Sequence, residues 1–164
     1  MAQSLLSSTF DRKEGWTTMN LEECAKFIDY RGKTPQKTDS GLRLITAKNA
    51  KMGYLQIEPR EFVAHESYDA WMTRGIPLKG DVIFTTEAPL ANVCQLDTDE
   101  KVVFAQRIIT LQPNREILNP AFLKYSLMSP QMQSIILKQA TGATVSGIKA
   151  KLLKKVEVSF PPIE

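Results

Sequence analysis

Residues 140–153, with the sequence ATGATVSGIKAKLL, place two glycines, two hydroxyl residues between them and a lysine close together. Such a stretch could hold a phosphate, because a Walker loop follows the pattern GxxxxGK[ST], with the lysine on the nucleotide and the hydroxyl on magnesium. Gly142 and Gly147 have the required separation, but Lys149 comes one position late and Ala150 follows it. The stretch therefore does not favour nucleotide hydrolysis.

A capped helix explains the same stretch better. Gly142 is expected to end a preceding helix, and Ser146 to cap a short helix from Gly147 to about Leu153, with Ile148 and Leu152 facing inward. The start of this helix and its lysines could still hold a phosphate of a nucleic-acid backbone. A capped connector with solvated lysines stays open as the alternative.

Two other motifs come close to catalytic patterns. Residues 119–122, Asn-Pro-Ala-Phe, differ by one residue from the Asn-Pro-Pro-Phe tetrad of DNA adenine methyltransferases, but no glycine-rich methyl-donor loop precedes them. Residues 99–101, Asp-Glu-Lys, match half of a nuclease motif that needs a further upstream acid, Asp81 or Asp97, to hold a metal. A standalone nuclease or methylase is therefore kept as an alternative.

The cysteine and histidine content disfavours metal and triad chemistry. Cys24 and Cys94 have no ligand spacing, and His65 is the only histidine. No apolar run approaches the roughly 20 residues that cross a bilayer. The first nine residues lack a basic signal-peptide region, so we expect a cytoplasmic protein with reduced cysteines and no membrane association.

Charge is distributed unevenly along the chain, although the net charge is only +3. Residues 30–57 and residues 138–155 each carry a net charge of +5, so the remainder of the chain is acidic. Either segment alone is typical of a solvated face. If folding brings the two basic segments together, they form a surface for a polyanion.

Short runs with period-two alternation or β-branched residues predict strands in the middle of the chain. They are residues 42–46, 54–57, 81–86, 91–96, 101–105 and 107–111. Turn residues separate these runs, and the acidic residues 97–99 are expected to turn a hairpin between two of the strands.

Helical signals are concentrated in the C-terminal half. Asn119-Pro120 supplies an N-cap and a proline at the first helical position, and Ser129-Pro130 repeats this arrangement. We expect two short helices with one side packed on the sheet, and a further helix over residues 67–74. The inward side chains would be Leu123 and Leu127 on the first helix, and Met132, Ile135, Ile136 and Gln139 on the second. The fold class is therefore mixed α+β, a single globular domain with a strand-rich centre and short helices in its C-terminal half.

Several segments, taken in order, resemble one protein family. They are Gly15-Trp16 with Leu21, Gly32-x-Thr34-Pro35, Gly80-Asp81-Val82, Gly142-x-Thr144 and Pro161-Pro162. Each of these elements alone has low specificity for the family. The ordered set spans residues 14–164 and is similar to a target recognition domain of the specificity (S) subunit of type I restriction-modification enzymes.

The resemblance implies a sequence-specific DNA reader without catalytic activity. A specificity subunit of that family holds two such domains, each reading half of a split target, and long helices between them hold methyltransferase (M) subunits. The implied partners are double-stranded DNA, M subunits and restriction (R) subunits. S-adenosylmethionine, ATP and magnesium are expected in the partner subunits, and no cofactor in this chain.

The resemblance also implies the domain organisation. Residues 1–13 are expected to form a flexible N-terminus and residues 14–164 the recognition domain. The family's spacer helix and second recognition domain have no counterpart in this sequence. It therefore corresponds either to an excised N-terminal domain or to a natural half-length subunit.

Candidate contact residues come from charge and loop position, because base-reading residues vary with the target in that family. Arg31, Gln36 and Asn49 are candidates for base readout in the major groove, since these side-chain types can bond a base edge through two hydrogen bonds. The candidates for backbone contacts are Lys33, Thr34, Lys37, Lys48, Lys51, Thr144, Ser146, Lys149, Lys151 and Lys154. A basic domain that only docks protein subunits remains a further alternative, and it would not need hydrogen-bonding side chains within its positive surface.

Overall fold

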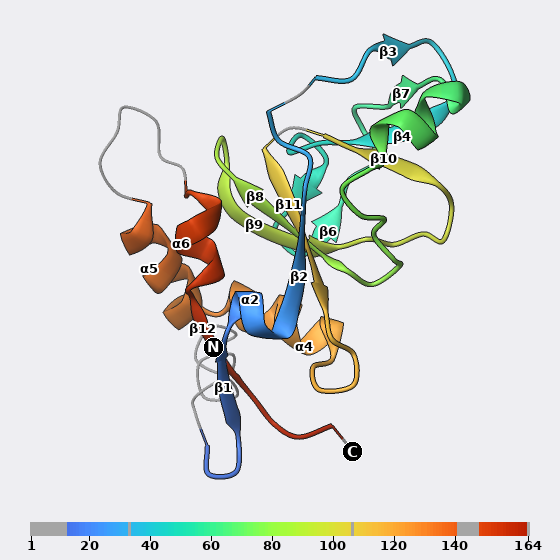
Figure 1. The fold of residues 1–164 in the computed structure, drawn as a ribbon. Helices are drawn as coiled ribbons and strands as arrows, with labels where there is room; N and C mark the ends of the chain where they lie inside the picture. Colours follow the sequence, from blue (N-terminus) through green and yellow to red (C-terminus); the bar gives the residue numbers. More distant parts are fainter. Residues whose placement is uncertain (1–12, 33, 106, 141–147, 164) are drawn as a thin grey trace.

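A four-stranded antiparallel sheet forms the centre of the fold (Figure 1). The computed structural model of the chain describes residues 13–32, 34–105, 107–140 and 148–163. The strands of the central sheet, in spatial order, are β2 (Ala25–Asp29), β11 (Ile108–Pro113), β8 (Val82–Thr86) and β9 (Leu90–Gln95). Successive side chains of a strand point to opposite faces, so Val82 and Phe84 enter one core while Ile83 enters the other. Every residue of β8 is buried because both faces of the sheet are covered.

A second four-stranded sheet covers one face of the central sheet. Its strands, in spatial order, are β10 (Val102–Phe104), β4 (Leu42–Ile45), β7 (Glu61–Val63) and β3 (Lys37–Thr38). The expected hairpin at residues 97–99 is wrong, because β9 pairs with β8 while β10 pairs in parallel with β4. Residues 96–101 therefore connect two different sheets.

Helices cover the other face of the central sheet (Figure 1). They are α2 (Leu21–Cys24), α4 (Pro120–Met128), α5 (Pro130–Gln139) and α6 (Ala150–Lys154). The two consecutive helices predicted from Asn119-Pro120 and Ser129-Pro130 are confirmed, and both caps accept backbone N–H groups. Leu123 and Leu127 of α4, and Met132 and Ile136 of α5, are buried as expected, whereas Ile135 and Gln139 are exposed. The inward side of α5 is therefore narrower than predicted.

The helix expected from residue 147 begins later. Lys149 occupies the N-cap position of α6, and Leu153 is its buried residue, while Leu152 is half-buried. Ile148 is buried, as predicted. Gly142, Ser146 and Gly147 lie outside the described residues. The expected helix over residues 67–74 is a 3-10 turn η1 (His65–Ser67) followed by the short α3 (Tyr68–Trp71).

Two small pairs of strands complete the fold. β1 (Thr17–Asn20) pairs with β12 (Glu157–Phe160), which brings the two ends of the described chain together. β5 (Ala50–Lys51) pairs with β6 (Tyr54–Leu55), and this hairpin packs against β9. Within the described residues, no helix is long and apolar enough to cross a membrane.

The two cysteines lie in different cores, Cys24 on the helix side of the central sheet and Cys94 on the other. Burial raises the pKa of Cys24 to about 11 and that of Cys94 to about 12. Because the thiolate is the reactive form, we expect neither thiol to react with a thiol reagent at about pH 8 until the protein unfolds. The unfolded chain ionises its thiols at lower pH, so their contribution to stability is lost as pH rises from 9 towards 11. Counting labelled thiols with and without denaturant tests this, and rapid labelling of the native protein would contradict it.

Candidate nucleic-acid interface

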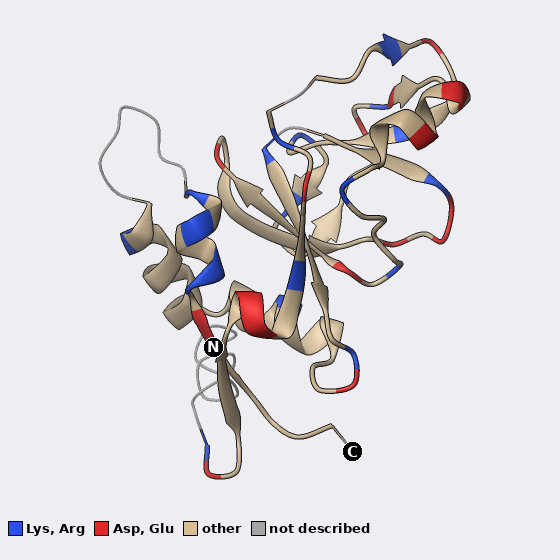
Figure 2. Ribbon diagram, viewed as in Figure 1, with Lys and Arg blue, Asp and Glu red and all other residues tan. Residues whose placement is uncertain are grey.

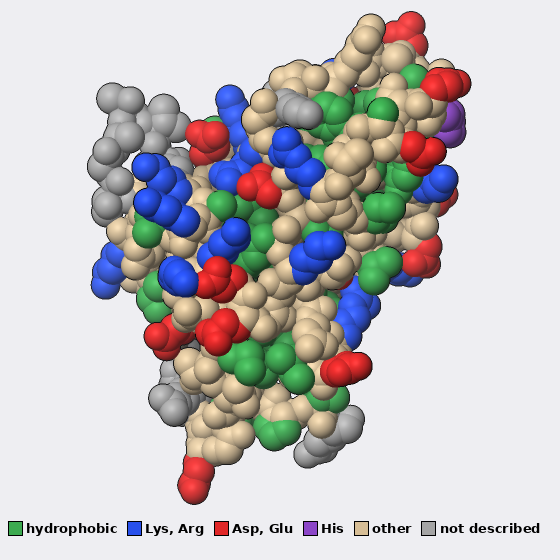
Figure 3. Space-filling model, in the orientation of Figure 1, with side chains coloured by type: hydrophobic (Ala, Val, Ile, Leu, Met, Phe, Trp, Pro, Cys, Tyr) green, Lys and Arg blue, Asp and Glu red, His purple; other side chains and the backbone are tan. Residues whose placement is uncertain are grey.

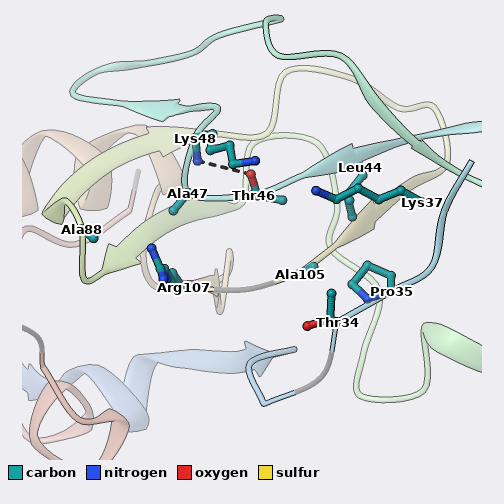
Figure 4. A pocket seen from close by; sticks show the side chains of 10 residues that line it. All are labelled: Thr34, Pro35, Lys37, Leu44, Thr46, Ala47, Lys48, Ala88, Ala105 and Arg107. Carbon is teal, nitrogen blue, oxygen red and sulfur yellow. Dashed lines mark hydrogen bonds between the residues drawn. The ribbon is translucent and has the colours of Figure 1, made fainter. Parts of the chain in front are cut away.

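A pocket of about 180 Å³ lies where four segments of the chain meet (Figure 4). Its lining combines three cationic side chains with two threonines and several apolar groups. The lining residues are Thr34, Pro35, Lys37, Leu44, Thr46, Ala47, Lys48, Ala88, Ala105 and Arg107. Figure 4 shows Lys48, Arg107 and Thr34 on separate segments around this space. The pocket can therefore offer both positive charge and hydrogen-bonding groups to one anionic ligand.

Arg107 is a lining residue that the sequence did not suggest, since it lies outside both basic segments. It is exposed and adopts a left-handed backbone conformation, with φ of 65°. Ala88, another lining residue of the pocket, is also left-handed, with φ of 41°. Such conformations are uncommon outside glycine and often accompany functional sites. The strain supports a functional role for this pocket.

The second basic segment begins near one edge of this pocket, to which two backbone hydrogen bonds connect it. Thr86, at the end of β8, donates its backbone N–H to the carbonyl of Arg107 at 2.9 Å. The carbonyl of Thr86 accepts the N–H of Ile148 at 3.0 Å, directly before Lys149. The start of α6 is thus attached to the strand end that forms one wall of the pocket.

We refer to the pocket together with the exposed face of α6 as the basic junction. Figure 2 shows Lys and Arg along α6 and at the start of β11, with an acidic residue at the turn between β8 and β9. On the same face in Figure 3, Lys and Arg side chains gather over α6 and over the upper end of the central sheet, with a few acidic side chains among them. Positive side chains of both predicted basic segments are therefore present on this face, with acidic side chains between some of them.

The lysines of α6 differ in their surroundings. Lys149 and Lys151 are exposed, and within the part of the chain that is described neither forms an ion pair. The ammonium of Lys154 lies 5.7 Å from the ring centre of Phe27 on β2, so it leans towards the body of the domain. The candidates Lys33, Thr144 and Ser146 lie outside the described residues. Lys149 and Lys151 are therefore the lysines of this helix best placed for an external anion.

Asn49, a candidate for base readout, is buried within the protein. Its side chain is fully buried, and its Oδ1 accepts the backbone N–H of Thr46 at 3.1 Å. Its Nδ2 donates to the carbonyls of Gln56 and Pro59, both at 3.1 Å. All of its hydrogen-bonding capacity is thus spent within its own loop, and Asn49 holds the segment that carries Lys48.

The other two base-readout candidates are accessible, but they differ in how firmly other groups of the protein hold their side chains. Arg31 forms a bidentate pair with Asp29, with Nε–Oδ1 and Nη2–Oδ2 distances of 2.8 and 2.7 Å. Burial opposes ionisation of Asp29, but the hydrogen bonds from Arg31 outweigh it and hold the pKa of that carboxyl below its usual range. Gln36 is exposed in the loop before β3, next to the pocket-lining Pro35 and Lys37. Gln36 therefore stays the more available candidate, and Arg31 must leave Asp29 to bond a base.

Lys51 is not part of the pocket lining. It is half-buried on β5, in the hairpin that packs against β9. Thr34, Lys37 and Lys48 do line the pocket. Of the backbone candidates from the first basic segment that the structure describes, three therefore line the pocket and Lys51 does not.

Asp81 and Asn119, which belonged to the patterns that resembled catalytic motifs, have structural roles. Asp81 is fully buried and accepts hydrogen bonds from the Leu78 backbone, Gln112 and Arg115, the last at 2.9 Å. The Oδ1 of Asn119 caps α4 by accepting the N–H of Ala121 at 2.8 Å. Among the described residues, no three His, Cys, Asp or Glu side chains are placed to hold a metal ion.

Comparisons with known proteins agree with this architecture. The family model of the type I restriction modification DNA specificity domain matches residues 13–164. A solved chain described with the assembly and conformational transition of a type I restriction-modification system is 19% identical, with a TM-score of 0.71. The HsdS subunit from Thermoanaerobacter tengcongensis is also 19% identical, with a TM-score of 0.67. The alignments cover 98% of this chain but 39% and 38% of those chains, so this chain spans about two fifths of their length.

A third similar structure is the type I S subunit from M. genitalium, at 18% identity and a TM-score of 0.50, covering 88% of this chain and 34% of that one. At these identities the structural likeness supports the fold. No curated protein sequence matches the chain.

Proposed function

Because the chain belongs to the family of type I restriction-modification DNA specificity domains, we propose that it binds double-stranded DNA through the basic junction and reads one half of a bipartite target. A specificity domain is the non-catalytic part of such an enzyme. The observation that supports the proposal is that Thr86 bonds both to Ile148, directly before Lys149, and to Arg107 of the pocket, whose lining includes Lys37 and Lys48 of the first basic segment.

The division of labour within this surface follows from side-chain chemistry. Lysine is a compact point charge that binds phosphate without reading a base, so Lys149 and Lys151 bind the DNA backbone. Gln36 and Arg31 can make paired hydrogen bonds to base edges in the major groove. Thr34 and Thr46 add hydroxyl groups to the positive pocket, which a surface that only docks protein subunits would not require. This composition favours DNA over a docking role.

The partners of the chain follow from the family. We propose that methyltransferase (M) and restriction (R) subunits assemble around the specificity subunit, and that it directs modification and cleavage to the target. S-adenosylmethionine, ATP and magnesium would be held by those subunits, and none by this chain. A protein of this kind acts on cellular DNA, which places it in the cytoplasm.

A competition experiment tests which residues bind the DNA backbone and which read bases. The target is first obtained by selection from a random-sequence duplex library, and binding of target and scrambled duplexes is then compared at fixed salt. We expect Lys149→Ala and Lys151→Ala to weaken binding to both duplexes alike and to lower the slope of log affinity against log salt by about one each. Gln36→Ala and Arg31→Ala should cost roughly 1 to 3 kcal/mol on the target alone.

The matched control is Lys79→Ala, which removes the same charge from an exposed loop that contributes to neither the pocket nor α6. The slope of log affinity against log salt for Lys79→Ala should equal that of the unaltered protein. If the unaltered chain bound DNA with no dependence on salt, the proposed surface would be wrong. A change of sequence preference in the lysine variants, without one in Gln36→Ala and Arg31→Ala, would reverse the assigned roles.

A further inference from the structure

One carboxylate lies within the basic junction and contacts two of its lysines. Glu61, at the start of β7, accepts a hydrogen bond from the Nζ of Lys37 through Oε2. Its Oε1 lies 3.5 Å from the Nζ of Lys48. Lys37 belongs to β3 and Lys48 to the loop after β4, so one carboxylate links two separate segments of the pocket wall.

Exposure differs sharply between the three side chains. The side chain of Glu61 is 16% exposed, whereas those of Lys37 and Lys48 are 46% and 61% exposed. A ligand at the pocket therefore meets the two ammonium groups, while the carboxylate stays behind them. The hydrogen bond from Lys37 holds the pKa of Glu61 below its usual range, so the group is a carboxylate at neutral pH.

This arrangement offsets the charge of the two lysines. One negative and two positive charges leave a local charge of about +1, so Lys37 and Lys48 attract fewer counter-ions than two unpaired lysines would. DNA affinity depends on salt through the counter-ions released when cations meet phosphates. By contrast, no described acidic group pairs with Lys149 or Lys151.

We propose that Glu61 is a positioning residue for DNA binding: it fixes Lys37 and Lys48 on the pocket wall and reduces their contribution to non-specific phosphate binding. The inference rests on the proposed function and assigns an opposing charge within that same site. Specificity is a ratio of affinities, so an element that weakens non-specific phosphate binding while it fixes the geometry that the target complex needs raises discrimination. In this arrangement the lysines of α6 supply most of the electrostatic attraction for DNA, and the pocket sets the orientation of the bound DNA.

Glu61→Gln tests the inference directly, with Glu58→Gln as its matched control. Both variants add one unit of positive charge, but Glu58 is an exposed residue that pairs with Arg60, outside the pocket lining. With a random-sequence duplex of about 24 base pairs, Glu61→Gln should steepen the salt slope by about one and tighten binding five- to tenfold at about 0.1 M salt. Glu58→Gln should change affinity by less than about twofold.

The first part of a second measurement does not depend on the folding of Glu61→Gln, because it uses the otherwise unaltered protein. In the otherwise unaltered protein, Lys37→Ala should lower the salt slope by less than about half as much as Lys149→Ala does. In the Glu61→Gln background, the same Lys37→Ala change should lower the slope by about one. The slope would not respond in this way if the pair only stabilised the fold.

The possible results separate this inference from the proposed function. If the unaltered chain does not bind the duplex, the proposed function fails. If it binds with the expected salt dependence but Lys37→Ala and Lys149→Ala lower the slope equally, the role of Glu61 is wrong and the DNA-binding surface stands. Equal slopes for Glu61→Gln and Glu58→Gln, with both proteins folded, would overturn the inference in the same way.

Discussion

Replacing Asn49 with alanine will lower the free energy of unfolding by about 3 kcal/mol. The side chain is fully buried and joins the loop after β4 to the segment between β6 and β7, through bonds to the Thr46 N–H and to the carbonyls of Gln56 and Pro59. Alanine leaves the buried N–H of Thr46 without its acceptor and removes the Asn49 donor from the partly buried carbonyls of Gln56 and Pro59. Each unpaired buried group costs about 1 to 3 kcal/mol.

Urea unfolding measures this loss, and Asn114→Ala is the matched control. Asn114 is exposed, and its Oδ1 accepts one backbone N–H, that of Glu116. Its replacement should cost less than about 1 kcal/mol. At a temperature where Asn49→Ala is still folded, its preference among DNA sequences should be unchanged. A stable variant with altered sequence preference would restore Asn49 as a base reader.

Arg107→Ala will weaken binding to duplex DNA by about tenfold or more, with a change in unfolding free energy within about 0.5 kcal/mol. Arg107 is exposed at the point where the pocket meets the attachment of α6, and within the described residues it takes part in no ion pair. Its charge is therefore fully available to a phosphate or to a guanine edge. Alanine would occupy the same left-handed conformation, so the backbone strain is retained.

Two variants separate charge from geometry at this position. Arg60→Ala removes an exposed arginine that pairs with Glu58 outside the pocket, and it should leave affinity within about twofold. Arg107→Lys keeps the charge but loses the planar fork of donors. It should keep the salt slope and recover only part of the affinity. Binding by Arg107→Ala equal to that of the unaltered protein would place the DNA surface elsewhere.

Local patterns in the sequence predicted much of the fold. Each of the six predicted strand regions contains a strand, and two proline-marked helices begin where expected. These signals work because alternation and N-caps act between residues a few positions apart. The strands β3 and β5 have two residues each, too few to show an alternation.

Pairing between distant segments could not be predicted in the same way. The turn residues 97–99 favoured a hairpin, yet β10 pairs with β4, some 60 residues earlier in the chain, because its side chains complete the second core. Hydrogen bonding between strands satisfies the same backbone groups whichever strand lies alongside, so the burial of side chains decides the partner.

The sequence by itself determined the family, the mixed α+β class and the two basic segments, since these depend on residue types, their order and short spacings. Only the tertiary structure decided which polar side chains face outward. Asn49 turns inward because its loop needs a buried amide to close it, and Arg31 and Lys37 are paired with carboxylates from their own surroundings. It also brought Arg107 to the junction of the basic segments. Charge and polarity belong to single residues, but availability to DNA depends on what the folded chain places beside them.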